Sequence, residues 1–215
     1  MLSKNEIVER ARTLGFADIG FTTADPFEPQ KQILKSRQED YAKAFGPQLD
    51  LIKGTEPRQL YPEAKSIVAL IHTYFDSYFP PAMEAKFGRC YLNDDRILRK
   101  GISQKSREFR RYLIENGGNA QFSNLLSDRL SAARAGLGTF GGNSLLYSTR
   151  VACKSSWISP VVMMVDREYE PDDPTFEIGC PEWCKNACIT ACPTGALKGP
   201  RHLNPGKLRM KDPGV

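Results

Sequence analysis

The spacing of apolar residues near the N-terminus predicts a helix followed by a strand. Residues 4–14 carry apolar side chains at helical spacing, and Ser3 with Glu6 forms the sequence of a capping box in front of them. Gly15 offers a C-terminal stop for this helix. Residues 16–21 then alternate between apolar and polar side chains, which is typical of a strand that leads into a loop.

Two short, continuous apolar runs further along the chain predict buried strands. Residues 66–71 are rich in β-branched side chains and follow Pro62. We therefore expect a strand that is buried on both faces and lies centrally in a sheet. Residues 161–165 form a second apolar run, which begins after Pro160 and ends at Asp166.

Two longer segments have the pattern of amphipathic helices. Residues 95–115 place apolar side chains among charged ones, and Gly117 with Gly118 would stop this helix. Residues 125–137 show a second helical pattern, which runs into a glycine-rich stretch. Together with the strands, these helices predict an α/β (α+β) fold.

A segment rich in proline and acidic residues, at positions 170–174, predicts a linker between two parts of the chain. At 215 residues the chain is long enough for one sizeable core and a small appended module. We therefore expect a main body at residues 1–174 and a cysteine-containing module at residues 175–215.

The composition is that of an ordinary globular protein with an excess of basic residues. Hydrophobic residues make up 40% of the chain, and the formal net charge of +5 suits an anionic partner such as RNA or an acidic redox protein. The N-terminus lacks the apolar stretch of a signal peptide, and no apolar run approaches the length of a membrane span. We expect a cytoplasmic protein with no membrane contact.

Four of the six cysteines lie within thirteen residues, at Cys180, Cys184, Cys188 and Cys192, and Pro193 follows the last of them. In a reducing compartment this spacing favours metal ligation over disulfide bonds. Each gap holds three residues, whereas the first gaps of the bacterial ferredoxin run hold two. We interpret the four thiols as ligands of a 4Fe-4S cluster, with a four-cysteine zinc site as the chemical alternative.

A glycine-rich stretch precedes Asn143. Glycines such as Gly138 and Gly141 let the backbone come close to a bound ligand and donate its N–H groups, and the Asn143 side-chain amide would reach the same ligand. The alternative is a tight turn between a helix and a strand. We predict that these three residues contact a cofactor.

The sequence resembles the epoxyqueuosine reductase family, which comprises cobalamin-dependent iron–sulfur enzymes related to reductive dehalogenases. Residues 56–68, residues 133–146 and the cysteine run carry the resemblance, which extends along nearly the whole chain. It implies a nitroreductase-like body that binds cobalamin and a ferredoxin-like module that supplies electrons to cobalt. Asp128 with Arg129 also matches a pair in the family, which makes Asp128 a candidate catalytic residue. The alternative for this pair is an ion pair on a helix surface.

Three positions depart from the family pattern. Phe122 occupies the position of the family's proton-donating aspartate, and phenylalanine cannot donate a proton. Arg96 stands where the resemblance leads us to expect a histidine. Leu208 stands where a family member usually has a cysteine, and no cysteine follows Cys192, so a second cluster lacks its ligands. The iron–sulfur module looks incomplete and the chain truncated relative to the family.

Two functions follow from these observations. The first is a cobalamin-dependent iron–sulfur oxidoreductase that removes oxygen or another leaving group reductively, with tRNA as a substrate. The second is a non-catalytic or electron-transfer protein that kept the fold, lost the proton donor and serves a redox partner. The basic side chains of residues 95–115 would either form a stripe that faces tRNA or a solvated helix face. We expect no DNA partner.

Overall fold

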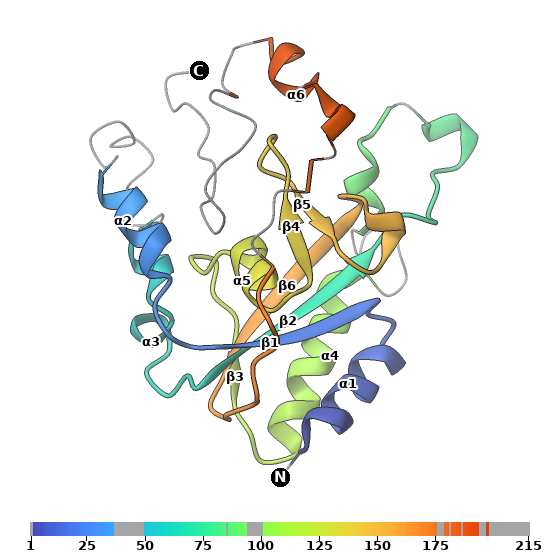
Figure 1. Ribbon diagram of the computed structural model, residues 1–215. Coiled ribbons are helices and arrows are strands. Elements are labelled where there is room, and N and C mark those ends of the chain that lie inside the picture. Colours follow the sequence, from blue (N-terminus) through green and yellow to red (C-terminus); the bar gives the residue numbers. More distant parts are fainter. Residues whose placement is uncertain are drawn as a thin grey trace.

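Four antiparallel strands form the central sheet of the protein, and helices lie on both of its faces (Figure 1). The computed structural model describes residues 2–36, 50–84, 86–93, 101–175, 179–180, 182–185, 187–193 and 197. The strand order is β1-β2-β6-β3. The mixed fold of helices and strands that the sequence predicted is confirmed.

Strand β2 (Ser66–Thr73) is the centre of the fold, because its apolar run supplies both cores. Successive side chains of a strand point to opposite faces. Ile67, Ala69 and Ile71 accordingly pack into one core, and Val68 and Leu70 pack into the other. The prediction of a central strand buried on both faces is therefore confirmed.

Helices α1 (Lys4–Thr13) and α4 (Ile102–Glu115) cover one face of the sheet (Figure 1). The predicted capping box at the start of α1 is present, with Ser3 and Glu6 bonded in both directions. Phe109 of α4 is fully buried and packs edge-on against Phe16, with 6.2 Å between the two ring centroids. Helix α4 begins after Gly101, and the predicted helical residues 95–100 lie outside the described residues.

The predicted bounds of the two strands that flank β2 need a correction. Strand β1 is Asp18–Thr23, because its pairing with β2 includes both threonines that the sequence pattern assigned to a loop. Strand β6 is Ile158–Val165 and contains Pro160, which the sequence pattern placed before the strand. The short strand β3 (Ala120–Gln121) pairs only with the end of β6, so among the described strands Pro160 has a neighbour on one side only. Proline is tolerated there because it need not donate to a second strand.

Helix α5 (Asp128–Arg134) packs on the opposite face of the sheet, beside a separate hairpin of strands β4 (Gly138–Phe140) and β5 (Leu146–Ser148). The remaining described elements are short, namely α2 (Glu28–Ser36), α3 (Pro57–Leu60), α6 (Ala187–Thr190), η2 (Lys53–Thr55), η3 (Pro81–Met83), η4 (Arg89–Asn93), η5 (Ala152–Lys154) and η6 (Glu182–Cys184). In the described residues no helix is long and apolar enough to span a bilayer.

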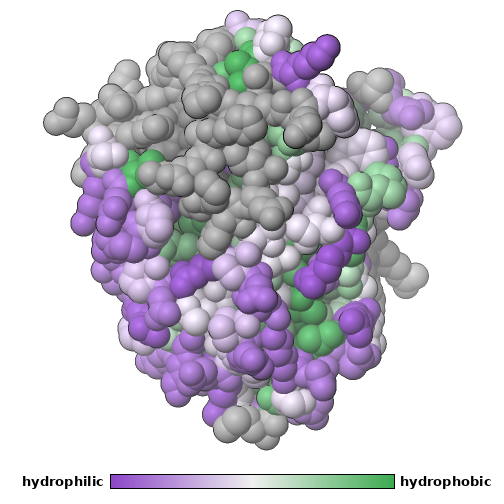
Figure 2. Space-filling model, in the orientation of Figure 1, coloured by the Kyte–Doolittle hydropathy of each residue, from purple (hydrophilic) through white to green (hydrophobic). Residues whose placement is uncertain are grey.

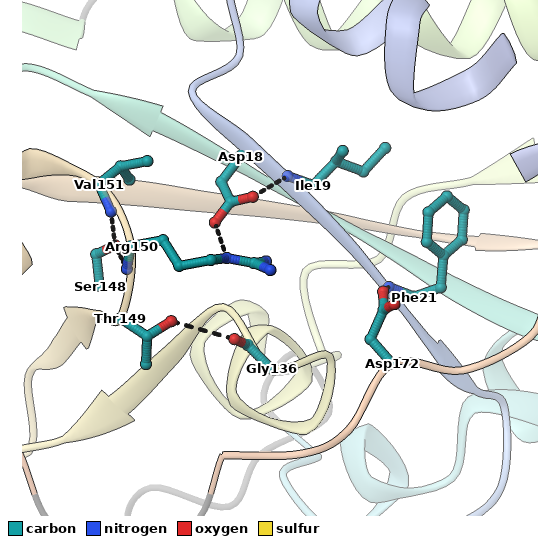
Figure 3. Close-up of polar contacts among 9 residues, drawn as sticks. All are labelled: Asp18, Ile19, Phe21, Gly136, Ser148, Thr149, Arg150, Val151 and Asp172. Carbon is teal, nitrogen blue, oxygen red and sulfur yellow. Dashed lines mark hydrogen bonds and ion pairs between the residues drawn. The ribbon is translucent and has the colours of Figure 1, made fainter. Parts of the chain in front are cut away.

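The predicted linker at residues 170–174 packs against the body. Its Asp172 carboxylate accepts a hydrogen bond from the Phe21 amide at 2.8 Å and pairs with the Lys4 ammonium at 2.7 Å. Figure 3 shows Asp172 beside strand β1 and, nearby, the Arg150 guanidinium bonded to Asp18 at 2.9 Å. This segment is thus hydrogen-bonded to strand β1. A domain boundary near residue 174 stays a prediction.

Candidate functional site

The site is built on helix α5 and the hairpin that follows it. Ser127 starts α5 because its side chain accepts a hydrogen bond from the Leu130 amide. Gly136 ends it with φ of +73°, a left-handed conformation that favours glycine. The helix is therefore shorter at both ends than the predicted residues 125–137. It turns the chain directly into the β4–β5 hairpin.

The glycines of this hairpin are required by its own packing. A Cβ atom on Gly138 would lie 2.8 Å from the Leu146 side chain and 2.8 Å from the Tyr147 carbonyl oxygen. A Cβ atom on Gly141 would lie 2.6 Å from the Tyr147 ring. Both glycines thus allow close approach of strand β5, as the tight-turn alternative requires.

Asn143 lies in the turn of the hairpin, and its side chain bonds within the turn. Its Oδ1 accepts a hydrogen bond from the Leu145 amide at 3.1 Å, and its Nδ2 donates to the Tyr147 hydroxyl at 2.9 Å. The Gly141 amide also bonds inside the hairpin, to the Leu145 carbonyl at 3.0 Å. These three predicted cofactor contacts, Gly138, Gly141 and Asn143, are therefore brought together, with the polar groups named here already bonded to the chain itself.

The hairpin turn contacts the first cysteine of the cysteine run. The Gly142 amide donates a hydrogen bond to the Cys180 sulfur at 3.0 Å. The Gly179 amide donates to the Phe140 carbonyl at 2.9 Å, and a Cβ atom on Gly179 would lie 2.7 Å from the Thr139 Cγ2. The two motifs that the sequence singled out, 38 residues apart, thus lie side by side.

The other three cysteines follow on short helical turns. Cys184 ends η6, Cys188 lies in α6, and Cys192 comes just after α6. Together with Cys180 they are partly exposed cysteines that form no disulfide bonds. Among the described residues, no three His, Cys, Asp or Glu side chains lie close enough together to hold a metal ion. Ligation by all four thiolates would require their sulfur atoms to lie closer together than they do in this structure.

Asp128 opens helix α5, and its carboxyl has an unusual pKa. The side chain contacts solvent, yet the protein around its other sides desolvates the carboxylate and raises the pKa from 3.8 to about 6. The Val162 backbone and the Arg129 charge act in the opposite direction and are weaker. Arg129 itself donates to the Ser144 carbonyl at 2.8 Å, which joins the start of α5 to the hairpin turn.

The positions that depart from the family pattern lie partly outside the described residues. Phe122 follows strand β3 and is 41% exposed, so its ring faces solvent. Arg96 and Leu208 fall outside the described residues.

Two basic residues of α4 have structural partners. Lys105 donates to the Gly15 carbonyl at 3.4 Å, and burial lowers its pKa. Arg110 donates to the Ala120 carbonyl at 2.6 Å. The basic surface of this helix is therefore smaller than its sequence suggested.

Thr139 is a residue that sequence reasoning missed. Its Oγ1 is buried and has no hydrogen-bond partner in the described structure, although its methyl group packs beside Gly179. An unpaired buried hydroxyl is costly and calls for an explanation. Nothing in the local sequence marks Thr139, because its neighbour comes from a distant part of the chain.

Curated relatives confirm the resemblance that the sequence indicated. The chain is 32% identical over 221 residues to an epoxyqueuosine reductase from Staphylococcus aureus, and 30% identical over 222 residues to one from Bacillus subtilis. These alignments cover 95% and 94% of this chain. The chain spans about half the length of these relatives, 54% and 53%. No protein-family model matches the sequence.

Solved structures show the same likeness. A crystal structure of epoxyqueuosine reductase with an epoxyqueuosine-modified tRNA-Tyr stem loop superposes with a TM-score of 0.70 and 28% identity. The match covers 95% of this chain and 54% of that one. A catabolic reductive dehalogenase matches 91% of this chain and 26% of its own, with a TM-score of 0.54 and 16% identity, and so shares the fold.

Proposed function

We propose, on the premise that this chain is homologous to epoxyqueuosine reductases along nearly its whole length, that it is an iron–sulfur oxidoreductase of the same kind. The reaction would be the reductive removal of oxygen or another leaving group, with cobalamin as a second cofactor. The observation that carries the proposal is the hydrogen bond from the Gly142 amide to the Cys180 sulfur, which joins the glycine turn to the cysteine run.

The cysteine run fits an iron–sulfur cluster by the chemistry of its donors. Cys180, Cys184, Cys188 and Cys192 form no disulfide bonds and are partly exposed, so their sulfur atoms are accessible to iron. A bound cluster would supply single electrons. The Gly142 amide would hold the Cys180 thiolate in place and offset part of its negative charge. We propose a 4Fe-4S cluster rather than zinc, since cysteine zinc sites usually separate two close pairs by a longer loop.

The hairpin would contact a flat corrin ring through van der Waals surface rather than through hydrogen bonds. Among its turn groups, the Gly141 and Gly142 amides and the Asn143 side chain bond to the protein itself. Exposed groups such as Leu145 would supply van der Waals contact. Bound cobalamin would provide the cobalt-centred reduction. We propose that the ring lies against this turn, near Gly138, Gly141 and Asn143.

Asp128 is the proposed proton donor. A general acid works best when its pKa lies near the working pH, and the carboxyl of Asp128 has a pKa of about 6. It therefore holds a proton over a range in which an ordinary aspartate has lost it. The hydrogen bond from Arg129 to Ser144 keeps the start of α5 beside the hairpin. Asp128 would protonate the departing oxygen in place of the aspartate that Phe122 replaces.

A tRNA is the proposed substrate, since a solved relative binds a modified tRNA stem loop and this chain has a net charge of +5. Such a substrate also suits a protein of the cytoplasm.

The second candidate function is an electron-transfer protein without catalysis of its own. Phe122 favours this function, because it replaces the family's proton-donating aspartate and cannot donate a proton. Its ring is exposed.

The test uses the full chain, reconstituted anaerobically with iron and sulfide and supplied with cobalamin, a strong reductant and tRNA that contains epoxyqueuosine. Conversion of the nucleoside, with loss of activity in Asp128→Asn, supports the proposed reaction and the proton donor. A chain that binds a cluster and passes electrons, and that leaves the tRNA unchanged even as Phe122→Asp, supports the electron-transfer function instead. Zinc without any iron–sulfur absorbance would overturn both.

A further inference from the structure

The segment that follows strand β2 projects beyond the sheet, as the green loop on the right of Figure 1 shows, and it carries an arginine in contact with aromatic rings. The Arg89 guanidinium lies over two rings, with its Cζ atom 3.9 Å from the centroid of Trp157 and 4.8 Å from that of Tyr78. The Phe75 ring packs on Trp157, with 5.4 Å between the two centroids. These four side chains form a continuous series of contacts, which we call the Arg89 stack.

Two hydrogen bonds hold Arg89 in this position. Its Nη2 donates to the Phe75 carbonyl at 2.8 Å and to the Ser77 carbonyl at 2.7 Å. Both acceptors are uncharged, and in the part of the chain that the structure describes no carboxylate pairs with Arg89. The guanidinium therefore fixes the rings that it touches, while its positive charge remains available to a ligand.

The Tyr78 ring offers an open face. Arg89 lies over one face of this ring, yet Tyr78 is 72% exposed, so the other face contacts solvent. The small buried cluster of the same segment contains none of the stack and consists of Tyr74, Phe79 and Leu92. A ring that is exposed and already held in one orientation binds a flat partner at little further cost in conformational entropy.

We propose that the Arg89 stack is a docking surface for single-stranded RNA, on which one unpaired base stacks against the open face of Tyr78. Every base can stack on an aromatic ring, and arginine adds cation–π attraction. The net charge of +5 attracts a polyanion to the chain as a whole. The inference rests on the tRNA substrate of the proposed function, because the loops of a tRNA offer unpaired bases.

The experiment uses the full chain with Trp183→Phe, which leaves Trp157 as its single tryptophan, since the sequence has two. An unmodified tRNA stem loop is the probe, and its affinity is measured by the fluorescence anisotropy of a label on the RNA. Trp157 fluorescence reports whether binding takes place at the stack. Binding should change this fluorescence, and a fully paired RNA duplex of the same length should bind more weakly, because its bases are not free to stack.

Three variants separate stacking from other contacts. Tyr78→Ala should weaken binding of the stem loop about 5- to 150-fold, the loss that one stacked base typically causes. Tyr78→Phe should bind like wild type, because it keeps the ring. Tyr91→Ala is the matched control, since Tyr91 is 51% exposed in the same segment and no arginine lies over its ring in the described structure. This control should also bind like wild type.

The salt dependence of binding is a second readout. Acidic and basic side chains of the described segment balance one another, namely Asp76, Glu84, Lys86 and Arg89. Stacking rather than phosphate contact should therefore dominate at this surface. Because stacking releases no counterions, Tyr78→Ala should leave the slope of log Kd against log salt concentration unchanged.

Three results would overturn this inference: wild-type affinity in Tyr78→Ala, an equal loss in Tyr91→Ala, or binding of the stem loop without a change in Trp157 fluorescence. Self-association of the chain that Tyr78→Ala abolishes would assign the surface to a second copy and would also overturn it. The binding assay involves no turnover, so binding at the stack without any reaction would refute the proposed reaction alone. A chain that binds no stem loop would refute the inference and the tRNA substrate together, and would leave the proposed redox chemistry standing.

Discussion

Replacing Asp128 by asparagine should change the stability of the protein in a defined pH window. Burial raises the pKa of this carboxyl from 3.8 to about 6, so the folded state binds the proton more tightly than the unfolded state does. As the pH rises from 3.8 to 6, the unfolded chain loses its proton first, and the free energy of unfolding falls. The loss is complete above about pH 6. The Asp128→Asn protein should lack this pH-dependent fall in the free energy of unfolding.

The size of this effect follows from the pKa change. A full shift from 3.8 to about 6 corresponds to about 3 kcal/mol at 1.36 kcal/mol for each pKa unit. The Asp128 side chain contacts solvent, which screens its charge, and we therefore expect about 1 kcal/mol. The free energy of unfolding of the Asp128→Asn protein should exceed that of wild type by this amount at pH 7 to 8. The difference between the two proteins should vanish near pH 3.5.

The assay is urea unfolding of both proteins between pH 3.5 and 8, with the difference in unfolding free energy plotted against pH. Asp173, an exposed acid of the linker, provides the control, and Asp173→Asn should not reproduce the plot. A difference that is flat across the window, or one that grows as the pH falls, would refute the desolvation argument. In the turnover assay the same variant should lose about 10²- to 10⁴-fold, as the loss of a general acid typically does.

Three further outcomes are expected. Gly138→Ala should cost about 1–3 kcal/mol in urea unfolding, because its Cβ atom would overlap the Leu146 side chain; wild-type stability would show that β5 can move away. Cys184→Ser should abolish most of the iron content and visible absorbance after reconstitution, and full retention of both would remove Cys184 from the ligand set. Burial lowers the pKa of His72 to about 4, so stability should fall as the pH drops from 6.5 to 4, and His72→Leu should flatten that slope.

One face of the protein is largely polar. Figure 2 shows that the described side chains on this face are mostly hydrophilic, with only scattered hydrophobic ones. Several large apolar side chains are nevertheless exposed, including Tyr78 at 72% and Trp183 at 80%. Trp183 lies inside the cysteine run, next to Cys184. Partners are therefore better sought at these exposed aromatic side chains and at the cysteines than over the surface as a whole.

The strand predictions show where local pattern succeeds and where it stops. A continuous apolar run marked β2 correctly, because both of its faces are buried. The bounds of β1 and β6 were wrong by two or three residues, since pairing with β2 decides where each strand begins and ends. The hairpin of β4 and β5 was interpreted as a turn, because its three-residue strands are too short to show alternation.

The sequence by itself determined the elements whose cause is local. The capping box of α1, the buried run of β2, the glycine stop of α4 and the cysteine run all follow from neighbouring residues. The resemblance to epoxyqueuosine reductases also rests on sequence alone.

Only the tertiary structure decided how these parts meet. The bond between Gly142 and Cys180, the buried hydroxyl of Thr139 and the raised pKa of Asp128 each depend on groups far away in the chain. Burial and hydrogen bonding are properties of the surroundings in space, so no local pattern can report them. For the same reason the sequence did not reveal that the glycine turn packs within its own hairpin and bonds to a cysteine, and its contact with a cofactor stays a prediction.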